Sequence, residues 1–239
     1  MKDDERELAE NCYGYGRWDA PFWFVGLEEG QARRENNNFT ERAKAFRELN
    51  KDGLCDCGKF HTKIDERRWF EVNPKTGKVD LQSTWRYLIL TLMSFQETLD
   101  SDEPMSDSLR AYQCAKWGAA DSPRGETCVI ELSGLPANNA KLSKERPNEM
   151  RQELEKIRPK RIERIRDAIR CRKPAFVVMY GMTAKEHWRG IAGAKLQACV
   201  PQKVESTIFL LAQHPTSRYK KGEKKDKYWT DLGVKLRQS

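Results

Sequence analysis

Residues 22–27 read Phe-Trp-Phe-Val-Gly-Leu, a short apolar run rich in aromatic and β-branched side chains and followed by two acidic residues. Three further runs have the same character, at residues 128–132, 175–181 and 206–212. Apolar runs of this length that end in Gly, Pro or a polar turn are typical of buried strands. The sequence therefore predicts that these runs form the strands of a central sheet.

The segments between the runs carry apolar side chains at helical spacing; they are residues 40–49, 81–99, 106–117, 149–171, 183–191 and 228–236. Pro159 is expected to break or kink the longest of these helices. Strands that alternate with helices favour a parallel sheet covered on both faces. We therefore expect an α/β fold of three layers (αβα) with a central four-stranded parallel sheet. One domain is expected over residues 1–239, with an inserted segment around 50–80 and a basic loop at 218–227.

The chain has 239 residues, with 44 Lys and Arg against 36 Asp and Glu, which gives a net charge of +8. Such a balance favours polyanionic partners, because basic side chains release counterions from nucleic acids; a solvated basic surface is the alternative. No stretch is apolar over the ~20 residues that a membrane span needs. The acidic start lacks a signal peptide's apolar segment, and the seven scattered Cys favour reduced thiols. We expect a cytoplasmic monomer with no membrane association and no cofactor.

Two strand ends carry polar motifs, and ligands of parallel α/β sheets bind at the carboxyl ends of the strands. The first predicted strand leads into Gly-Leu-Glu-Glu-Gly at residues 26–30, and the last leads into Gln-His-Pro-Thr-Ser-Arg at residues 213–218. In this order, they resemble the first and second motifs of the uracil-DNA glycosylase superfamily, whose second motif has the core His-Pro-Ser. The resemblance spans about residues 20 to 220, although only these short anchors are specific.

This resemblance implies a DNA glycosylase that hydrolyses the N-glycosidic bond of a base flipped out of the DNA stack. A carboxylate must hold water beneath the sugar, and a hydrogen-bond donor must stabilise the leaving base. The resemblance assigns these catalytic roles to Glu28 and His214. Glu29 is the alternative to Glu28, because the register of the motif is uncertain by one residue. Both Glu side chains would otherwise be acids at the N-terminus of a helix.

The same resemblance implies contacts to the base and to the DNA backbone. Gly26 and Phe39 are expected at the base, Phe39 as a stacking aromatic; a core position at the start of the helix at 40–49 is the alternative for Phe39. The expected DNA-binding residues follow His214: Thr216 and Ser217 on a phosphate, Arg218 in the gap left by the flipped base, and Lys220 and Lys221 facing the duplex. A solvated basic loop is the alternative for this segment.

Two departures from the family pattern concern the substrate. Glu29 replaces the usual Pro of the first motif, and Glu131 stands where uracil-specific members carry an Asn. A carboxylate accepts a hydrogen bond from the exocyclic amino group of cytosine but cannot donate one to O4 of uracil. The sequence thus favours a modified cytosine-type base, such as the hypermodified cytosines of some bacteriophage DNA, and an antiviral defence role. The alternatives are repair of uracil or another deaminated base, and a catalytically inactive DNA-binding module.

A zinc site is the other motif to consider. Cys55, Cys57 and His61 lie close together in the sequence, but no second cysteine pair with zinc-site spacing is near, and Cys12 would have to be recruited. We therefore expect no metal, and an inserted hairpin loop in this region.

Overall fold

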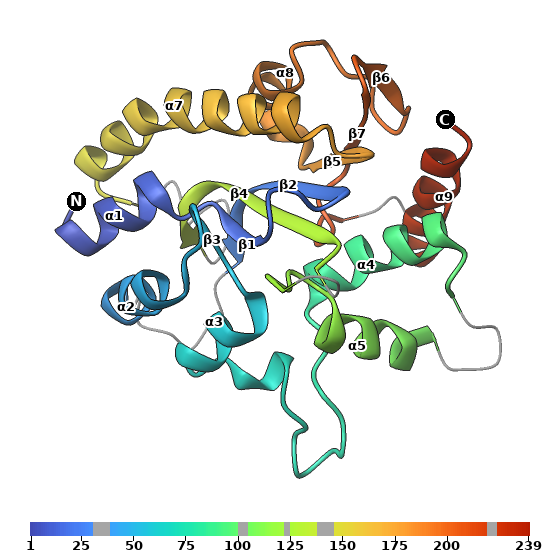
Figure 1. The fold of residues 1–239 in the computed structure, drawn as a ribbon, viewed down its shortest axis with the longest axis horizontal. Coiled ribbons are helices and arrows are strands. Elements are labelled where there is room, and N and C mark those ends of the chain that lie inside the picture. Colours follow the sequence, from blue (N-terminus) through green and yellow to red (C-terminus); the bar gives the residue numbers. More distant parts are fainter. Residues whose placement is uncertain (31–38, 100–104, 122–124, 138–145, 219–223) are drawn as a thin grey trace.

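The computed structural model describes residues 1–30, 39–99, 105–121, 125–137, 146–218 and 224–239. The described residues form an α/β fold around a mixed seven-stranded sheet with the strand order β3-β1-β4-β2-β5-β7-β6 (Figure 1). The expected α/β class is confirmed, whereas the sheet is larger than the four parallel strands that the sequence predicts.

The four predicted strands form the centre of this sheet. They are β4 (Thr127–Ala137), β2 (Phe22–Gly30), β5 (Phe176–Tyr180) and β7 (Thr207–Ala212), and neighbours among them are parallel. The remaining strands extend the two edges: β1 (Gly14–Gly16) pairs antiparallel with β4 and parallel with β3 (Leu54–Cys55), and β6 (Gln202–Val204) pairs antiparallel with β7. These edge strands have two or three residues each, too few for a hydrophobic pattern to reveal them.

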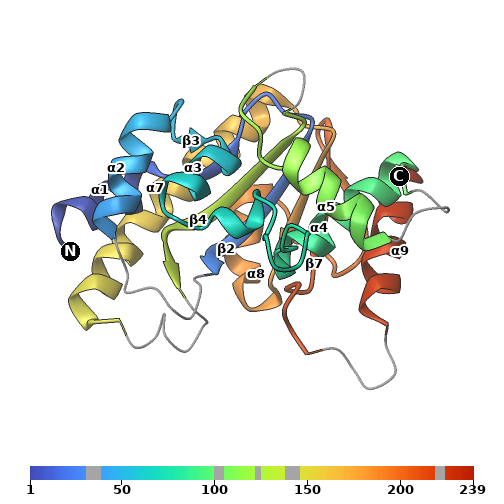
Figure 2. The ribbon, with the colours of Figure 1, turned by 90° about the horizontal axis from the view of Figure 1, so that it is seen from below.

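Helices cover both faces of the sheet, which gives the three-layer arrangement that Figures 1 and 2 show. One face is covered by α7 (Asn148–Arg172) and α8 (Lys185–Ala192). The other is covered by α2 (Phe39–Leu49), α3 (Cys57–Lys63), α4 (Ser83–Gln96), α5 (Met105–Ala115) and α9 (Lys225–Arg237). The buried side chains of β2 alternate between these layers: Trp23 and Val25 face α7 and α8, and Phe24 faces the other side.

Of the break or kink expected at Pro159, the break is wrong, because α7 runs through this residue without interruption. Proline removes one intrahelical hydrogen bond, and Arg161, one half-turn further on, ties the helix to the sheet. Its buried guanidinium donates to the carbonyl oxygens of Leu132, Glu131 and Cys12, each at 2.7 Å. Tertiary contacts therefore hold α7 together where the local sequence weakens it.

Two other boundaries also differ from expectation. The segment around residues 50–80 is not a plain hairpin loop: it contains β3, α3 and the 3₁₀-helix η1 (Arg67–Trp69). Helix α9 begins at Lys225, so the last residues of the expected basic loop at 218–227 belong to a helix. At the N-terminus, α1 (Asp3–Asn11) contacts α2 and α7. No helix among the described ranges has the length and apolar character needed to cross a membrane.

Candidate active site

The parallel register brings side chains from neighbouring strands together at their carboxyl ends. Phe24 of β2, Val129 of β4 and Val178 of β5 point into the same core, beneath α4 and α9. Side chains two positions further along a strand point the same way, and these are Gly26, Glu131 and Tyr180. Gly26 is the direct neighbour of Glu131 in the ladder between β2 and β4. The polar end of the sheet thus continues its apolar core.

Tyr180 and Glu131 form a buried pair above Gly26. The phenol of Tyr180 donates a hydrogen bond of 3.1 Å to Oε1 of Glu131. A Cβ atom on Gly26 would lie 2.3 Å from the Tyr180 hydroxyl and 2.6 Å from Oε2 of Glu131. Both distances are far inside van der Waals contact, so only glycine leaves room for this pair. The structural role of Gly26 is therefore to make space for the carboxyl group that the sequence places at the base.

The carboxyl group of Glu131 is held in a setting that favours its neutral form. Burial raises the pKa of Glu131 well above its usual range, and the charges of Glu29 and Glu28 raise it further. Only Oε1 has a hydrogen-bond partner among the described residues; Oε2 has none. Burial also raises the pKa of Tyr180, which keeps its phenol a donor. Because Oε1 accepts from Tyr180, Oε2 is the oxygen that is available to carry the proton in the neutral form.

His214 follows β7 and lies against Tyr180, with the two ring centroids 5.6 Å apart and the rings nearly edge to face. Its Nδ1 accepts the backbone N–H of Thr216 at 3.2 Å and lies 2.9 Å from the Thr216 hydroxyl. Burial and the charge of Lys225 lower the pKa of His214, which favours a neutral ring. A neutral ring whose Nδ1 accepts a backbone N–H carries its proton on Nε2. His214 is therefore built as a hydrogen-bond donor through Nε2.

Glu28 lies at the end of β2, where its backbone pairs with Ser133 of β4. One carboxyl oxygen is 3.5 Å from a guanidinium nitrogen of Arg146, and both side chains are largely buried. Arg146 also donates to the carbonyl oxygens of Leu135 and Pro136, at 3.1 and 2.8 Å. Arg146 thus ties Glu28 to the end of the neighbouring strand.

Glu29 faces a different set of partners. Its carboxylate accepts the phenol of Tyr15 at 2.8 Å, pairs with Arg42 of α2, and lies 3.3 Å from Nε2 of His61 of α3. Burial alone would raise the pKa of Glu29, but the charge of Arg42 and the contacts with His61 and Tyr15 outweigh it and lower this pKa to about 2. Glu29 therefore anchors α2 and α3 to the sheet, which makes Glu28 the better candidate for the catalytic carboxylate.

The other predicted site residues have varied surroundings. Phe39 begins α2, is half-buried and packs against the core, as its alternative interpretation has it. Thr216 binds the His214 ring, and the Ser217 N–H donates to the His214 carbonyl oxygen at 2.9 Å, so both residues shape the turn after β7. Arg218 is exposed. Lys220 and Lys221 lie outside the described residues.

In the region of Cys55, Cys57 and His61, where zinc was considered, the His61 ring contacts other groups of the protein. His61 is buried with Nδ1 2.8 Å from the Cys57 carbonyl oxygen and Nε2 near Glu29. Across the parts of the chain that the structure describes, no group of three or more His, Cys, Asp and Glu side chains is arranged to hold a metal ion.

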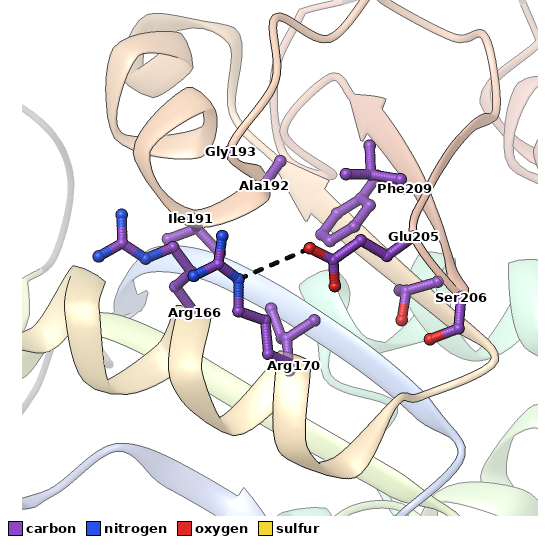
Figure 3. A pocket seen from close by; sticks show the side chains of 11 residues that line it. Arg166, Arg170, Ile191, Ala192, Gly193, Glu205, Ser206 and Phe209 are labelled. Carbon is purple, nitrogen blue, oxygen red and sulfur yellow. Dashed lines mark ion pairs between the residues drawn. The ribbon is translucent and has the colours of Figure 1, made fainter.

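A concavity lies at the opposite end of the central strands, between α7, α8 and the hairpin of β6 and β7 (Figure 3). Arg170 and Glu205 face each other across it, with 3.9 Å between Nε and Oε1. It lies where β7 begins, at Thr207, and ligands of α/β sheets bind at the carboxyl ends instead. The polar cluster of Glu28, Glu131, Tyr180 and His214 is therefore the candidate active site.

Comparison with known proteins finds no matching family model and no matching curated protein. The resemblance to the uracil-DNA glycosylase superfamily thus rests on the two motifs. Sequence reasoning missed Tyr180, Arg146 and Arg161 in the site. Tyr180 had a usable signal, since it ends the third apolar run two residues after a buried Val; the two arginines had none, because they reach the strands from distant segments.

Proposed function

We propose that this protein is a DNA glycosylase that hydrolyses the N-glycosidic bond of a modified cytosine-type base and leaves an abasic site. One observation carries the proposal: Tyr180 holds Oε1 of Glu131 and also lies against His214, so a histidine and a buried carboxyl group with one oxygen unpartnered among the described residues meet at the carboxyl ends of the strands. With Glu131 neutral, the site would offer two donors, Nε2–H of His214 and Oε2–H of Glu131, and one acceptor, Oε1 of Glu131.

This set of two donors and one acceptor matches the hydrogen-bonding edge of cytosine. From O2 through N3 to the exocyclic N4 amino group, cytosine presents an acceptor, a second acceptor and a donor. A base held with O2 on His214 would therefore accept from Oε2–H at N3 and donate its N4–H to Oε1. Oxygen Oε1 has a second lone pair for this contact beside the one that Tyr180 uses.

Uracil in the same orientation is a poor partner. Its N3–H would meet the Oε2–H of Glu131, donor against donor, and its O4 would meet Oε1, acceptor against acceptor. A good base-edge contact gives ~1–3 kcal/mol of discrimination against the wrong base. The neutral carboxyl thus distinguishes the two bases by proton position. This refines the expectation from sequence, in which an ionised Glu131 accepts only from the amino group.

The reaction assigned to this site needs two further groups. Glu28 would accept a proton from water beneath the sugar, while Nε2–H of His214 stabilises the charge that grows on O2 of the leaving base. Burial strongly raises the pKa of Glu131 and the pKa of Tyr180, and shifted pKa values are common among active-site groups. The net charge of +8 supports binding to the DNA backbone.

The test is a base-release assay on DNA duplexes that each carry one altered base, followed by alkaline cleavage of abasic sites. Strand breaks at a modified cytosine that disappear in both the Glu28→Gln and the His214→Ala variant support the proposal. Binding without breaks in any duplex would instead make the chain a DNA-binding module, and breaks at uracil alone a uracil glycosylase. The exposed Lys203 of β6, changed to Ala, is the control, because it lies away from the candidate site.

A further inference from the structure

We propose that Glu131 is the general acid of the reaction, and that its Oε2 proton moves to ring nitrogen N3 of the flipped base as the glycosidic bond breaks. This inference rests on the proposed function. It gives Glu131 a role in the chemical step in addition to its role in recognising the base.

The geometry gives Glu131 one occupied and one available oxygen. Tyr180 fixes Oε1 through a 3.1 Å hydrogen bond, and no described residue partners Oε2, which lies over the bare α-carbon of Gly26. Buried polar atoms without a partner are rare in native proteins and call for an explanation. A base that accepts the Oε2 proton would supply the missing partner.

A base reaches Oε2 only when the site opens around it, because this atom is shielded from solvent. The last side-chain torsion of Glu has a broad profile, so a partial turn of the carboxyl group can bring Oε2 toward an incoming base. The contact with N3 therefore forms upon base flipping and is absent in the free protein.

The groups around Glu131 explain why a proton is held there for transfer. Glu28 and Glu29 of β2 face it as negative charges, Tyr180 of β5 donates to it, and the Arg161 guanidinium of α7 is the nearby positive charge. Arg161 binds the backbone carbonyl of Glu131, and burial together with the two acidic neighbours outweighs it, so that the carboxyl stays protonated. Donation to a basic ring nitrogen suits such a group, and the carboxylate left behind is stabilised by Tyr180 and Arg161.

The Oε2–H bond and the C1′–N1 bond break, and an N3–H bond and a C1′–O bond to water form. The electron pair of the C1′–N1 bond stays on the base, which leaves as its neutral N3–H tautomer. Water gives its second proton to Glu28, and the sugar becomes the hydroxyl of an abasic site. Proton exchange with solvent returns Glu28 and Glu131 to their starting states.

The test removes either the donor or the acceptor of this proton. Single-turnover release is measured for wild type and Glu131→Gln on two duplexes, one with 5-hydroxymethylcytosine and one with its 3-deaza analogue, in which C–H replaces N3. We expect wild type to lose ~10²-fold on the analogue and Glu131→Gln to lose ~10²-fold on the normal base, the scale of one general acid. Because the two changes delete one transfer, Glu131→Gln on the analogue should be no slower than either change alone.

The amide introduced by Glu131→Gln would keep one donor and one acceptor, so the dissociation constant for a duplex with 5-hydroxymethylcytosine should stay at the wild-type value; this variant then separates binding from proton transfer. Equal wild-type rates on both duplexes, or losses that multiply, would overturn the inference while leaving the glycosylase function in place. No release by wild type from 5-hydroxymethylcytosine would instead overturn the proposed function itself. Glu163→Gln, which changes an exposed carboxylate of α7, is the matched control.

Discussion

The phenol of Tyr180 donates a hydrogen bond of 3.1 Å to Oε1 of Glu131, and Oε2 has no partner among the described residues. A neutral carboxyl group held in this way would offer one acceptor, Oε1, and one donor, Oε2–H. The chemistry proposed for this protein depends on this pair of groups, and the space for both side chains depends on the missing side chain of Gly26.

Gly26→Ala should damage the site through overpacking. The new methyl group would lie within 2.6 Å of both Tyr180 and Glu131, and forced repacking of this kind costs ~1–3 kcal/mol. Urea unfolding should show this loss, and base release should fall with it. Gly58→Ala in α3 is the control, because its added methyl meets only ordinary contacts, the nearest at 3.4 Å. Equal stability of the two variants would show that the pair does not fill the space above Gly26.

Glu131→Gln should stabilise the protein by an amount that grows with pH. Folding raises the pKa of Glu131 above its ordinary value of 4.5. Glu131 therefore contributes fully to stability at pH values below 4.5, and this contribution is lost as the pH rises toward the folded-state pKa. Through this window the unfolded chain gives up a proton that the folded protein keeps, and the difference between variant and wild type should grow by about 1.4 kcal/mol per pH unit. Urea unfolding from pH 4 to 8 measures it; a difference that does not change with pH would mean an ionised Glu131.

Substitutions of the neighbours Glu28 and Glu29 should have different effects, one on activity and the other on stability. Glu29→Gln leaves the buried Arg42 guanidinium without its counter-charge, which typically costs ~3–5 kcal/mol. Because the pKa of Glu29 is lowered to about 2, its contribution is present above the ordinary value of 4.5 and should disappear as pH falls from there toward 2. Glu28→Gln should instead slow base release by ~10²-fold. An active, stable Glu29→Gln protein would contradict the anchoring role.

Lys220 and Lys221 are predicted to contact the DNA backbone. Changing both to Ala should lower the slope of log K against log salt by ~1.8, the loss of two phosphate contacts, and weaken binding to all duplexes alike. The exposed pair Lys195 and Lys203, near the opposite edge of the sheet, provides a double control with the same change of charge. Identical salt slopes for both double variants would leave residues 218–227 without a specific role in DNA binding.

The sequence predicts the centre of the fold because its signals there are strong and local. The apolar runs that become β2, β4, β5 and β7 carry their own pattern of buried side chains. The edge strands carry no such pattern: β1 is Gly-Tyr-Gly and forms because β4 and β3 offer it hydrogen bonds on both sides. Helix α7 shows the same effect, since contacts through Arg161 override the local signal of Pro159.

The sequence likewise predicts some features of the candidate site and not others. Glu28 and His214 were identified because each lies in a motif that follows a predicted strand, and Glu131 because it lies near the end of one; strand ends meet in a parallel sheet. The sequence could not predict the charge states of these side chains, because the charge states depend on burial and on groups from distant segments. The neutral form of Glu131 depends on burial and on the charges of Glu28 and Glu29 of the neighbouring strand, and the role of Glu29 depends on Arg42 and His61, 13 and 32 residues away.

The most direct test of the central claim compares base release from three duplexes of one sequence, with a single uracil, 5-hydroxymethylcytosine or glucosylated 5-hydroxymethylcytosine. The two donors and one acceptor of His214 and Glu131 predict abasic sites at a cytosine derivative and little or no release of uracil. Glu131→Asn should weaken release of the cytosine derivative, because an amide holds no proton that it can transfer to N3. Rapid release of uracil with no action on either cytosine derivative would contradict the account.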